Sequence, residues 1–403
     1  MSEIFKPSVS IEKALLNILA VGFGIPFALF DYIPISLLDV DMFMVFFIIF
    51  ILGRSKLPHN IVLLIIPIII SLSCIAVELA IGDSSYRPFM SVGYFFKPYL
   101  AYVVGYSIIV NICELRKMIH KILLILIVVL CSAAILGNAT FRGDLAILGL
   151  SVFGSSGTNA LMVYLAFLLM LSASLLDSSQ NRLHKIFFAV LFLIVIGIII
   201  ESSSRQALLG IIIFCLLSLK NYKNNIIIFA LLAVFIFTFI NVNPPRALVA
   251  KLNRDKTAIS EVDADSFSAG RTLIYYSMVK DIIQNPWLGN SFKGFSESNI
   301  PVEFEYSSGL SPHNQYLGAL WKMGAVAFVF YIAFLFTSVL QLWKMHRNNI
   351  TEYRNLAYTT AVVLLLFMNT QDFLTFGLTG NLFMLVLGGL RRINREKLKL
   401  VEV

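Results

Sequence analysis

The sequence predicts an all-α integral membrane protein with about twelve transmembrane helices and a large periplasmic loop, forming one domain over residues 1–403. Of the 403 residues, 58% are hydrophobic and only 13% are charged, and the mean hydropathy is +0.85. A soluble domain is roughly half apolar and about one quarter charged. A chain of this composition therefore needs lipid around most of its surface.

The second observation is a series of apolar runs that approach the roughly 20 residues needed to cross a bilayer. Between them lie short polar connections, with one exception after the ninth run. We predict spans over residues 13–31, 37–52, 61–81, 89–110, 119–137, 157–176, 186–201, 205–219, 225–242, 314–342, 355–370 and 374–390.

Basic residues predict the orientation of these spans. Short loops on one side are rich in Lys and Arg, and the C-terminal tail on that side adds five more: Arg391, Arg392, Arg395, Lys397 and Lys399. Short loops on the other side carry only Arg87, Arg142 and Arg205. Cytoplasmic loops are the basic ones, so both termini are predicted to be cytoplasmic. The same loops explain the net charge of +8 without invoking nucleic acid.

The long connection, residues 243–312, lies between the ninth and tenth predicted spans and is expected outside the cell membrane. Loops of this length usually carry function or are disordered. Within it, Arg271 to Ile283 has apolar residues at helical spacing. We predict an amphipathic helix there, lying on the membrane face of the loop.

Three polar segments stand out on the predicted outer side: residues 201–209, 268–271 and 311–317. In the third, Ser311 is a good N-cap and Pro312 a good first helical residue, which would place His313 in the first turn of the tenth span. The positive end of that helix favours a neutral imidazole, which can act as a general base. The alternative is that His313 is only a capping or interfacial residue.

Two arginines in the other segments, Arg205 and Arg271, suit a phosphate or diphosphate because a guanidinium can bind it through two parallel hydrogen bonds. Arg205 follows three serines, Ser204 among them, and such a polar cluster is costly in an apolar chain unless it is used. Alternatively, Arg205 pairs with Glu201 and Arg271 reaches lipid headgroups.

Other charged residues are weaker candidates. Lys97, next to Pro98, would be a fixed cation inside the fourth span, and Glu78 and Asp372 are isolated acids for which a structural role is as good an explanation. The pair Asp263 and Asp265 has the form of a metal-binding DxD, but most short acidic pairs are merely solvated. We therefore predict no metal site and no cofactor.

The three segments together resemble a known family. They contain Ser202–Arg205, then Gly270-Arg271 followed by Asn285-Pro286-Trp287-Leu288-Gly289-Asn290, and then Pro312-His313-Asn314 with Tyr316, Leu317 and Gly324. Their order and their common side are similar to the bacterial O-antigen ligase and O-antigen polymerase superfamily. The resemblance covers roughly residues 201–330, and the remainder of the chain agrees in topology only.

The resemblance implies a C-type membrane glycosyltransferase of the bacterial inner membrane, with its active site facing the periplasm. The donor would be a glycan on undecaprenyl diphosphate, transferred with inversion and without metal. Arg205 and Arg271 match the residues that hold the diphosphate, and His313 matches the general base. Lys97, Asn314, Tyr316 and Ser204 are secondary candidates. Expected partners are the lipid-linked donor, an acceptor glycan or lipid A-core, membrane lipid and a chain-length regulator.

Polymerase and ligase differ only in the acceptor. We favour a polymerase, which extends another lipid-linked repeat unit, because the sequence outside the motifs matches no ligase pattern. A flippase or transporter for lipid-linked glycans is the alternative from another class, although such proteins usually show two related halves that this sequence lacks. A membrane scaffold with a docking loop is a third reading.

Overall fold

The computed structural model describes the parts of the chain that form its helices and the turns next to them. The described residues are 9–25, 37–52, 57–80, 87–135, 145–147, 150–152, 157–176, 182–201, 204–219, 271–292, 314–347, 351–370, 373–374 and 377–401.

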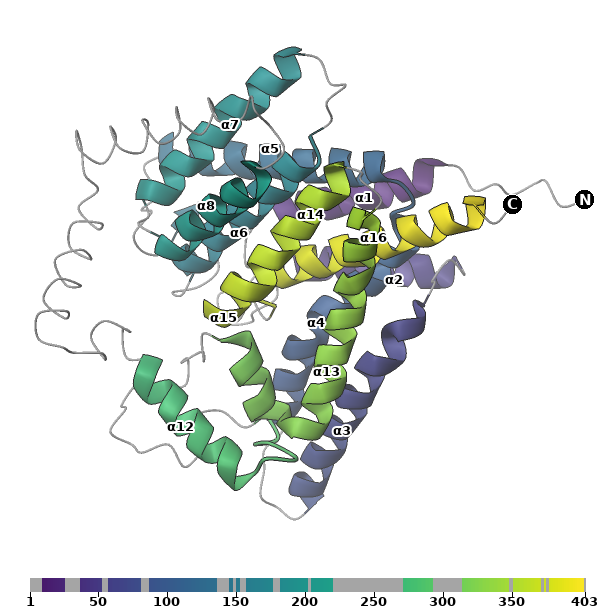
Figure 1. Cartoon of the computed structure of the whole chain (residues 1–403), viewed down its shortest axis with the longest axis vertical. Helices are drawn as coiled ribbons and strands as arrows, with labels where there is room; N and C mark the ends of the chain where they lie inside the picture. The colour runs from purple at the N-terminus through teal and green to yellow at the C-terminus, as the bar shows by residue number, and fades with distance from the viewer. Residues whose placement is uncertain are drawn as a thin grey trace, which may run out of the picture.

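Almost all of these residues are helical, which confirms the predicted all-α class (Figure 1). The exception is a pair of three-residue antiparallel strands. In chain order the elements are α1 (Val9–Gly24), α2 (Leu37–Ile51), a 3₁₀ turn (His59–Ile61), α3 (Val62–Ala80), α4 (Arg87–Ile108), α5 (Ile112–Ile135), β1 (Leu145–Ile147), β2 (Leu150–Val152), α6 (Gly157–Ser174), α7 (Arg182–Glu201), α8 (Arg205–Leu219), α12 (Arg271–Gln284), α13 (Gln315–Arg347), α14 (Thr351–Val362), a π-helical turn (Val363–Phe367), α15 (Met368–Thr370) and α16 (Gly377–Val401).

Most predicted spans coincide with a helix. Two helical segments of the described chain are long and apolar enough to cross a membrane, His59–Ala80 and Gln315–Lys344. Four shorter apolar helices accompany them, at Asp41–Ile51, Leu161–Ser174, Ile186–Ile200 and Arg205–Ser218. The predicted span 225–242 and residues 243–270 of the loop lie outside the described residues. The number of spans and the periplasmic position of the loop therefore remain predictions.

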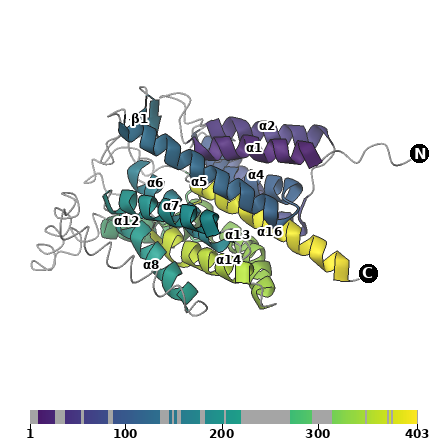
Figure 2. The ribbon, with the colours of Figure 1, turned by 90° about the horizontal axis from the view of Figure 1, so that it is seen from above.

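Helices α4 and α16 pack with their backbones in contact near the middle of the bundle (Figures 1 and 2). A Cβ atom at Gly105 would lie 2.0 Å from the carbonyl oxygen of Leu385, and one at Gly388 would lie 2.1 Å from that of Tyr102. No other residue type fits at either position. Small residues that allow close approach are the usual means of helix association in lipid, where apolar burial alone gives little driving force.

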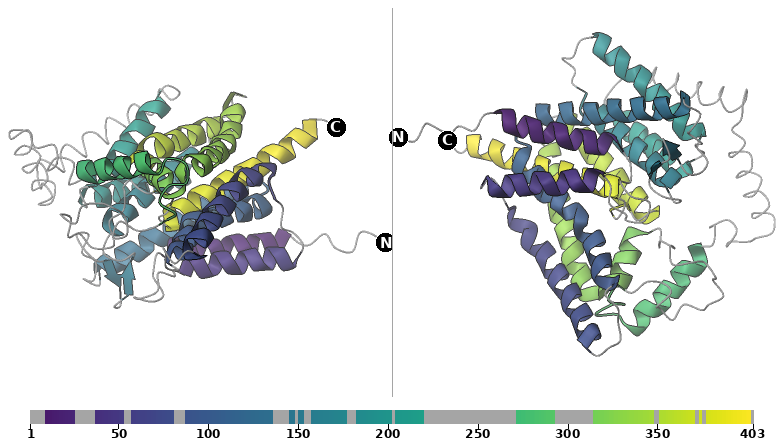
Figure 3. Two further views of the ribbon diagram at one scale, coloured as in Figure 1. Left: turned by 90° about the horizontal axis from the view of Figure 1, so that it is seen from below. Right: turned by 180° about the vertical axis from the view of Figure 1, so that it is seen from behind.

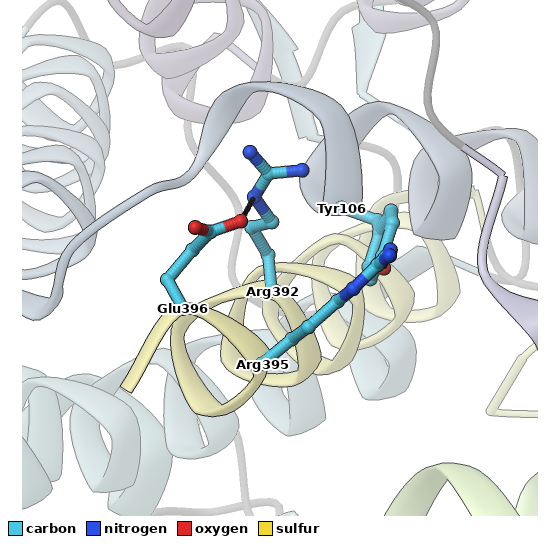
Figure 4. Close-up of polar contacts among 4 residues, drawn as sticks. All are labelled: Tyr106, Arg392, Arg395 and Glu396. Atoms are coloured by element: carbon cyan, nitrogen blue, oxygen red, sulfur yellow. Dashed lines mark hydrogen bonds and ion pairs between the residues drawn. The ribbon is translucent and has the colours of Figure 1, made fainter. Parts of the chain in front are cut away.

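Polar contacts extend this pairing toward the basic end of α16 (Figure 4). Arg395 donates to the hydroxyl of Tyr106 on α4 at 2.7 Å, and Arg392 pairs with Glu396 at 3.0 Å. The hydrogen bond with Tyr106 raises the pKa of the Arg395 guanidinium. Beyond Gly388, side-chain contact therefore replaces backbone contact between the basic end of α16 and α4.

Helix α13 is two helices that meet at Gly324, so the prediction of one continuous span over 314–342 is wrong. Gly324 has φ 69° and ψ 172°, a conformation almost confined to glycine. In a straight helix, residues sixteen apart would be separated by about 24 Å. The side-chain amide of Gln315 nevertheless lies 3.2 Å from the hydroxyl of Tyr331. The first part of α13 therefore folds back beside the second, as Figure 3 also shows.

The turn after α12 stabilises this break in α13 through backbone hydrogen bonds. In an unbroken helix Ala325 and Val326 would donate to the carbonyls of Trp321 and Lys322. Here Ala325 donates to Pro286 at 2.8 Å and Val326 to Trp287 at 3.4 Å. The two carbonyls that lose their helical donors are bound instead by the turn, Trp321 by the N–H of Asn290 at 3.0 Å and Lys322 by the N–H of Phe292 at 3.3 Å. These four backbone groups at the break thus have new partners, as an apolar environment requires.

Two glycines allow this exchange. A Cβ atom on Gly324 would lie 2.3 Å from the carbonyl oxygen of Trp287, and one on Gly289, which has φ 68°, would lie 2.5 Å from the nitrogen of Gly324. We call this pair of glycines and the four hydrogen bonds around it the glycine junction. It explains why the Asn285–Asn290 motif and the distant Gly324 occur together: they are the two halves of one contact.

Candidate functional site

The first part of α13 begins at Gln315, with Asn314 as its N-cap. The side-chain oxygen of Asn314 accepts hydrogen bonds from the N–H groups of Tyr316 at 3.1 Å and Leu317 at 2.9 Å. The prediction that the cap is Ser311 and that the helix starts at Pro312 is therefore wrong. Asn314 takes that role because its short amide reaches the free N–H groups of the first turn. His313 directly precedes the cap and lies outside the described residues.

Two residues of this first turn bind the chain that leads from α14 to α16. Gln315 is buried, and its side-chain oxygen accepts a hydrogen bond from the backbone N–H of Leu374 at 3.1 Å. The hydroxyl of Tyr316 donates to the carbonyl of Leu364 at 2.9 Å, in the π-helical turn. A π-helical turn weakens the regular pattern of backbone hydrogen bonds and is frequent at functional sites. The start of α13 is thus fixed to this stretch at two points.

Helix α8 begins close to the same stretch. Ser204 is buried, and its carbonyl accepts the first hydrogen bond of the helix, from Leu208 at 3.2 Å. Arg205 is the first helical residue, and its side chain is exposed. The neighbouring Gln206 donates from its side-chain amide to the carbonyl of Thr370 at 3.1 Å.

Residues 363–370 and 373–374, which we call the linking segment, therefore bind the N-termini of two helices. One carries Arg205 and the other is capped by the residue after His313. Helix N-termini carry the positive end of the helix dipole, which attracts anions. The segment contacts both the helix that begins at Arg205 and the helix that follows His313, although these two residues are about a hundred positions apart in the sequence.

The third motif begins α12. Arg271 is the first residue of α12, which extends to Gln284, so the prediction of a helix over 271–283 is confirmed. The glycine junction fixes the far end of α12, and about 20 Å of helix separate it from Arg271. The side chain of Arg271 lies outside the described part of the structure. Its position relative to Arg205 and His313 remains a prediction.

The secondary candidates differ in what they do in the fold. Tyr316 and Asn314 make the structural contacts described above. Lys97 is half-buried in α4 beside Pro98, which lies inside the helix as predicted. Glu78 is half-buried near the end of α3. The side chain of Glu201, the predicted alternative partner of Arg205, lies outside the described residues.

The predicted DxD and one isolated acid cannot be placed. Asp263, Asp265 and Asp372 lie outside the described residues. Within the described ranges, no three His, Cys, Asp or Glu side chains are grouped as a metal site. The described residues thus offer no donor set that would hold a metal near the linking segment.

Two positioning residues were not singled out from the sequence. Gln206 and Gln315 lie next to Arg205 and Asn314 within the same motifs, and both use their amides to bind backbone groups of the linking segment. The signal was present, because an amide side chain is costly in an apolar helix unless it is paired. What the sequence could not supply was the partner, which is a backbone group far along the chain.

Residues 190–332 match the family model described as O-antigen ligase. This match, over about a third of the chain, supports a relationship to the O-antigen ligase and polymerase superfamily. No curated protein matches the chain. The matched region of this O-antigen ligase-like protein runs from α7 into the second part of α13, and so includes Arg205, α12, the glycine junction and His313. The predicted recognition is thus confirmed on the part of the chain that carries the three motifs.

The match to the O-antigen ligase family supports a broad class. These are bacterial membrane proteins of surface-polysaccharide biosynthesis that act as membrane glycosyltransferase-like ligases or polymerases on lipid-linked glycans and their acceptors. The helices described above that could cross a membrane agree with this class.

Proposed function

We propose that this protein is a surface-polysaccharide polymerase of the bacterial inner membrane, which transfers a glycan from undecaprenyl diphosphate to a hydroxyl of a lipid-linked repeat unit. The observation that carries the proposal is the linking segment, to which the N-termini of α8 and α13 are both attached. That arrangement favours an anionic substrate between the Arg205 and His313 motifs.

The reaction needs two kinds of group. The acceptor hydroxyl oxygen attacks the anomeric carbon, the bond from that carbon to the diphosphate oxygen breaks, and the configuration inverts. His313 takes the hydroxyl proton as the new bond forms. Arg205 and Arg271 stabilise the negative charge that grows on the departing undecaprenyl diphosphate. All three roles come from the family resemblance and the motif positions.

The fold-back of α13 supports a recessed site. Gln315 reaches Tyr331, seven residues beyond Gly324 and thus about 10 Å further along the second helix. Gln315, which follows His313 by two positions in the sequence, is therefore buried within the bundle. A recess excludes water, which would otherwise compete with the acceptor hydroxyl.

A test uses purified protein with synthetic lipid-linked oligosaccharide. We expect chain growth by the wild type, and a loss of about 10²-fold or more for His313→Ala, as is usual when a general base is removed. His59→Ala, at an exposed histidine of the 3₁₀ turn, is the matched control and should keep full activity. Transport of unmodified lipid across liposomes, without chain growth, would support the flippase instead.

The ligase is the second candidate, because the family description names it. Lipopolysaccharide from a deletion strain separates the two. A core carrying one repeat unit means that a polymerase was lost. A bare core, with polymer left on the carrier lipid, means that a ligase was lost and would contradict the polymerase proposal.

A further inference from the structure

One face of α12 and the turn after it is apolar and exposed. Four of its residues, Tyr276, Val279, Ile283 and Trp287, are three or four positions apart and therefore share a side of the helix, and Leu288 follows. The exposed fractions are 72% for Tyr276, 73% for Ile283 and 68% for Trp287. We call these five residues the outer stripe.

The opposite face of α12 is already bound to the bundle. Met278 is fully buried, and Asp281 accepts a hydrogen bond from the indole N–H of Trp321 at 3.2 Å. The glycine junction fixes the end of the element through backbone groups. The outer stripe therefore cannot turn inward, and its exposure is a fixed property of how α12 docks.

We infer that the outer stripe is immersed in the headgroup region of the outer leaflet, so that α12 anchors the catalytic loop to the lipid surface. We assign lipid as the occupant because the stripe adjoins exposed apolar residues of α13, which belongs to a segment apolar enough to cross a membrane. Val326 donates to the carbonyl of Trp287, and Val326 and Val329 are exposed on the second part of α13. The side of α13 that leads away from the junction is thus apolar and exposed from its first turn.

Composition and direction agree with an interfacial position. Tyr and Trp are the residues enriched where the bilayer meets water, because their rings are apolar and their tips polar. Lys280 is exposed at the edge of the stripe, where its long side chain can reach a phosphate. Figure 1 shows α12 at the end of the bundle, lying crosswise to α3 and α13 rather than along them. A helix parallel to the membrane surface would have this direction.

Fluorescence of Trp287 tests the inference without reference to catalysis. The full-length protein is placed in nanodiscs, and the emission lost in Trp287→Phe is assigned to Trp287. The side chain is exposed and its backbone contacts remain, so the variant should fold. In bilayers brominated near the headgroup end of the acyl chains, we expect about twofold more quenching of this emission than with bromine at the chain tips, since interfacial helices lie about 5–10 Å deep. Iodide in the buffer should quench it little.

A charge placed in the stripe provides the second measurement. Ile283→Glu should lift the stripe toward water and raise iodide quenching of Trp287 by about twofold, whereas Gln284→Glu, exposed on the same helix but outside the stripe, should not change it. Strong iodide quenching of the wild type without any bromine effect would show that the stripe faces water. Protection from both quenchers would show that another protein, or a second copy of this chain, covers it. Either result overturns the inference, and neither affects the test of His313.

Discussion

At the scale of single residues, the site depends on short polar side chains that satisfy backbone groups. Asn314 caps the first part of α13, and Gln315, Gln206 and Tyr316 each bind a backbone group of the linking segment. None of these contacts is a surface pair. Each pairs a backbone group with a side chain, and leaving such a group unpaired in apolar surroundings costs about 1–3 kcal/mol.

Asn314→Ala should destabilise the start of α13 by about 1 kcal/mol, the usual cost of losing an N-cap, and should lower activity because His313 is the preceding residue. The check is thermal unfolding together with chain growth. Asn314→Asp keeps the oxygen that accepts both hydrogen bonds, so it should restore stability and most activity. Equal loss in both variants would mean that the amide N–H, rather than the cap, is what the reaction needs.

The sequence predicts such residues only in part. The motifs place His313, Arg205 and Arg271 beside helix starts, and the helix starts at Arg205 and Arg271 are confirmed. The sequence predicts the N-cap of α13 at Ser311, three residues before the true cap at Asn314, because Ser311-Pro312 has the usual composition of a helix start. Asn is an equally good N-cap residue. Local composition cannot choose between two good caps. The choice is made by Gln315 and Tyr316, whose partners lie about fifty residues later.

At the scale of elements, the broken α13 is the main departure from the predicted spans. A long apolar run predicts one helix, and hydropathy carries no signal of the reversal at Gly324. The break is stable only because the turn after α12 supplies both donors and acceptors for it. The amphipathic helix over 271–283 was predictable because its periodicity is local, whereas its docking on α13 was not.

Gly324→Ala should destabilise the protein by at least the roughly 1–2 kcal/mol that a left-handed backbone costs an alanine, and by more because its Cβ would overlap the carbonyl of Trp287. Folded yield and thermal unfolding in detergent measure this. Gly93→Ala is the matched control: it lies in α4, and a Cβ there meets nothing within 4 Å. Similar yields and unfolding temperatures for the two variants would contradict the assigned role of the glycine junction.

At the scale of the whole molecule, one axis runs through the fold. Contact between the backbones of α4 and α16 forms its middle, the basic end of α16 lies toward one side, and α12 lies across the other (Figures 1 and 3). The Lys and Arg pattern predicts which side is cytoplasmic. This prediction is possible because the positive-inside rule uses only the Lys and Arg content of the loops and does not depend on how the helices pack.

The native Cys113 provides a reporter for this orientation. It is exposed near the start of α5, on the predicted cytoplasmic side. In intact spheroplasts, a membrane-impermeant maleimide should not label the wild type at this position until the membrane is opened. A Cys113→Ser protein carrying Gln284→Cys on α12 should be labelled at once, and Cys113→Ser alone gives the background. Rapid labelling of Cys113 in intact spheroplasts would reverse the predicted topology.

The four hydrogen bonds of the glycine junction join main-chain atoms, so they place little restriction on side-chain chemistry. Apart from the two glycines, the residues that face outward from this turn can therefore be replaced without loss of the glycine junction. A scaffold of this kind allows a protein engineer who makes chimaeras to exchange the exterior segment without redesigning the helices that support it.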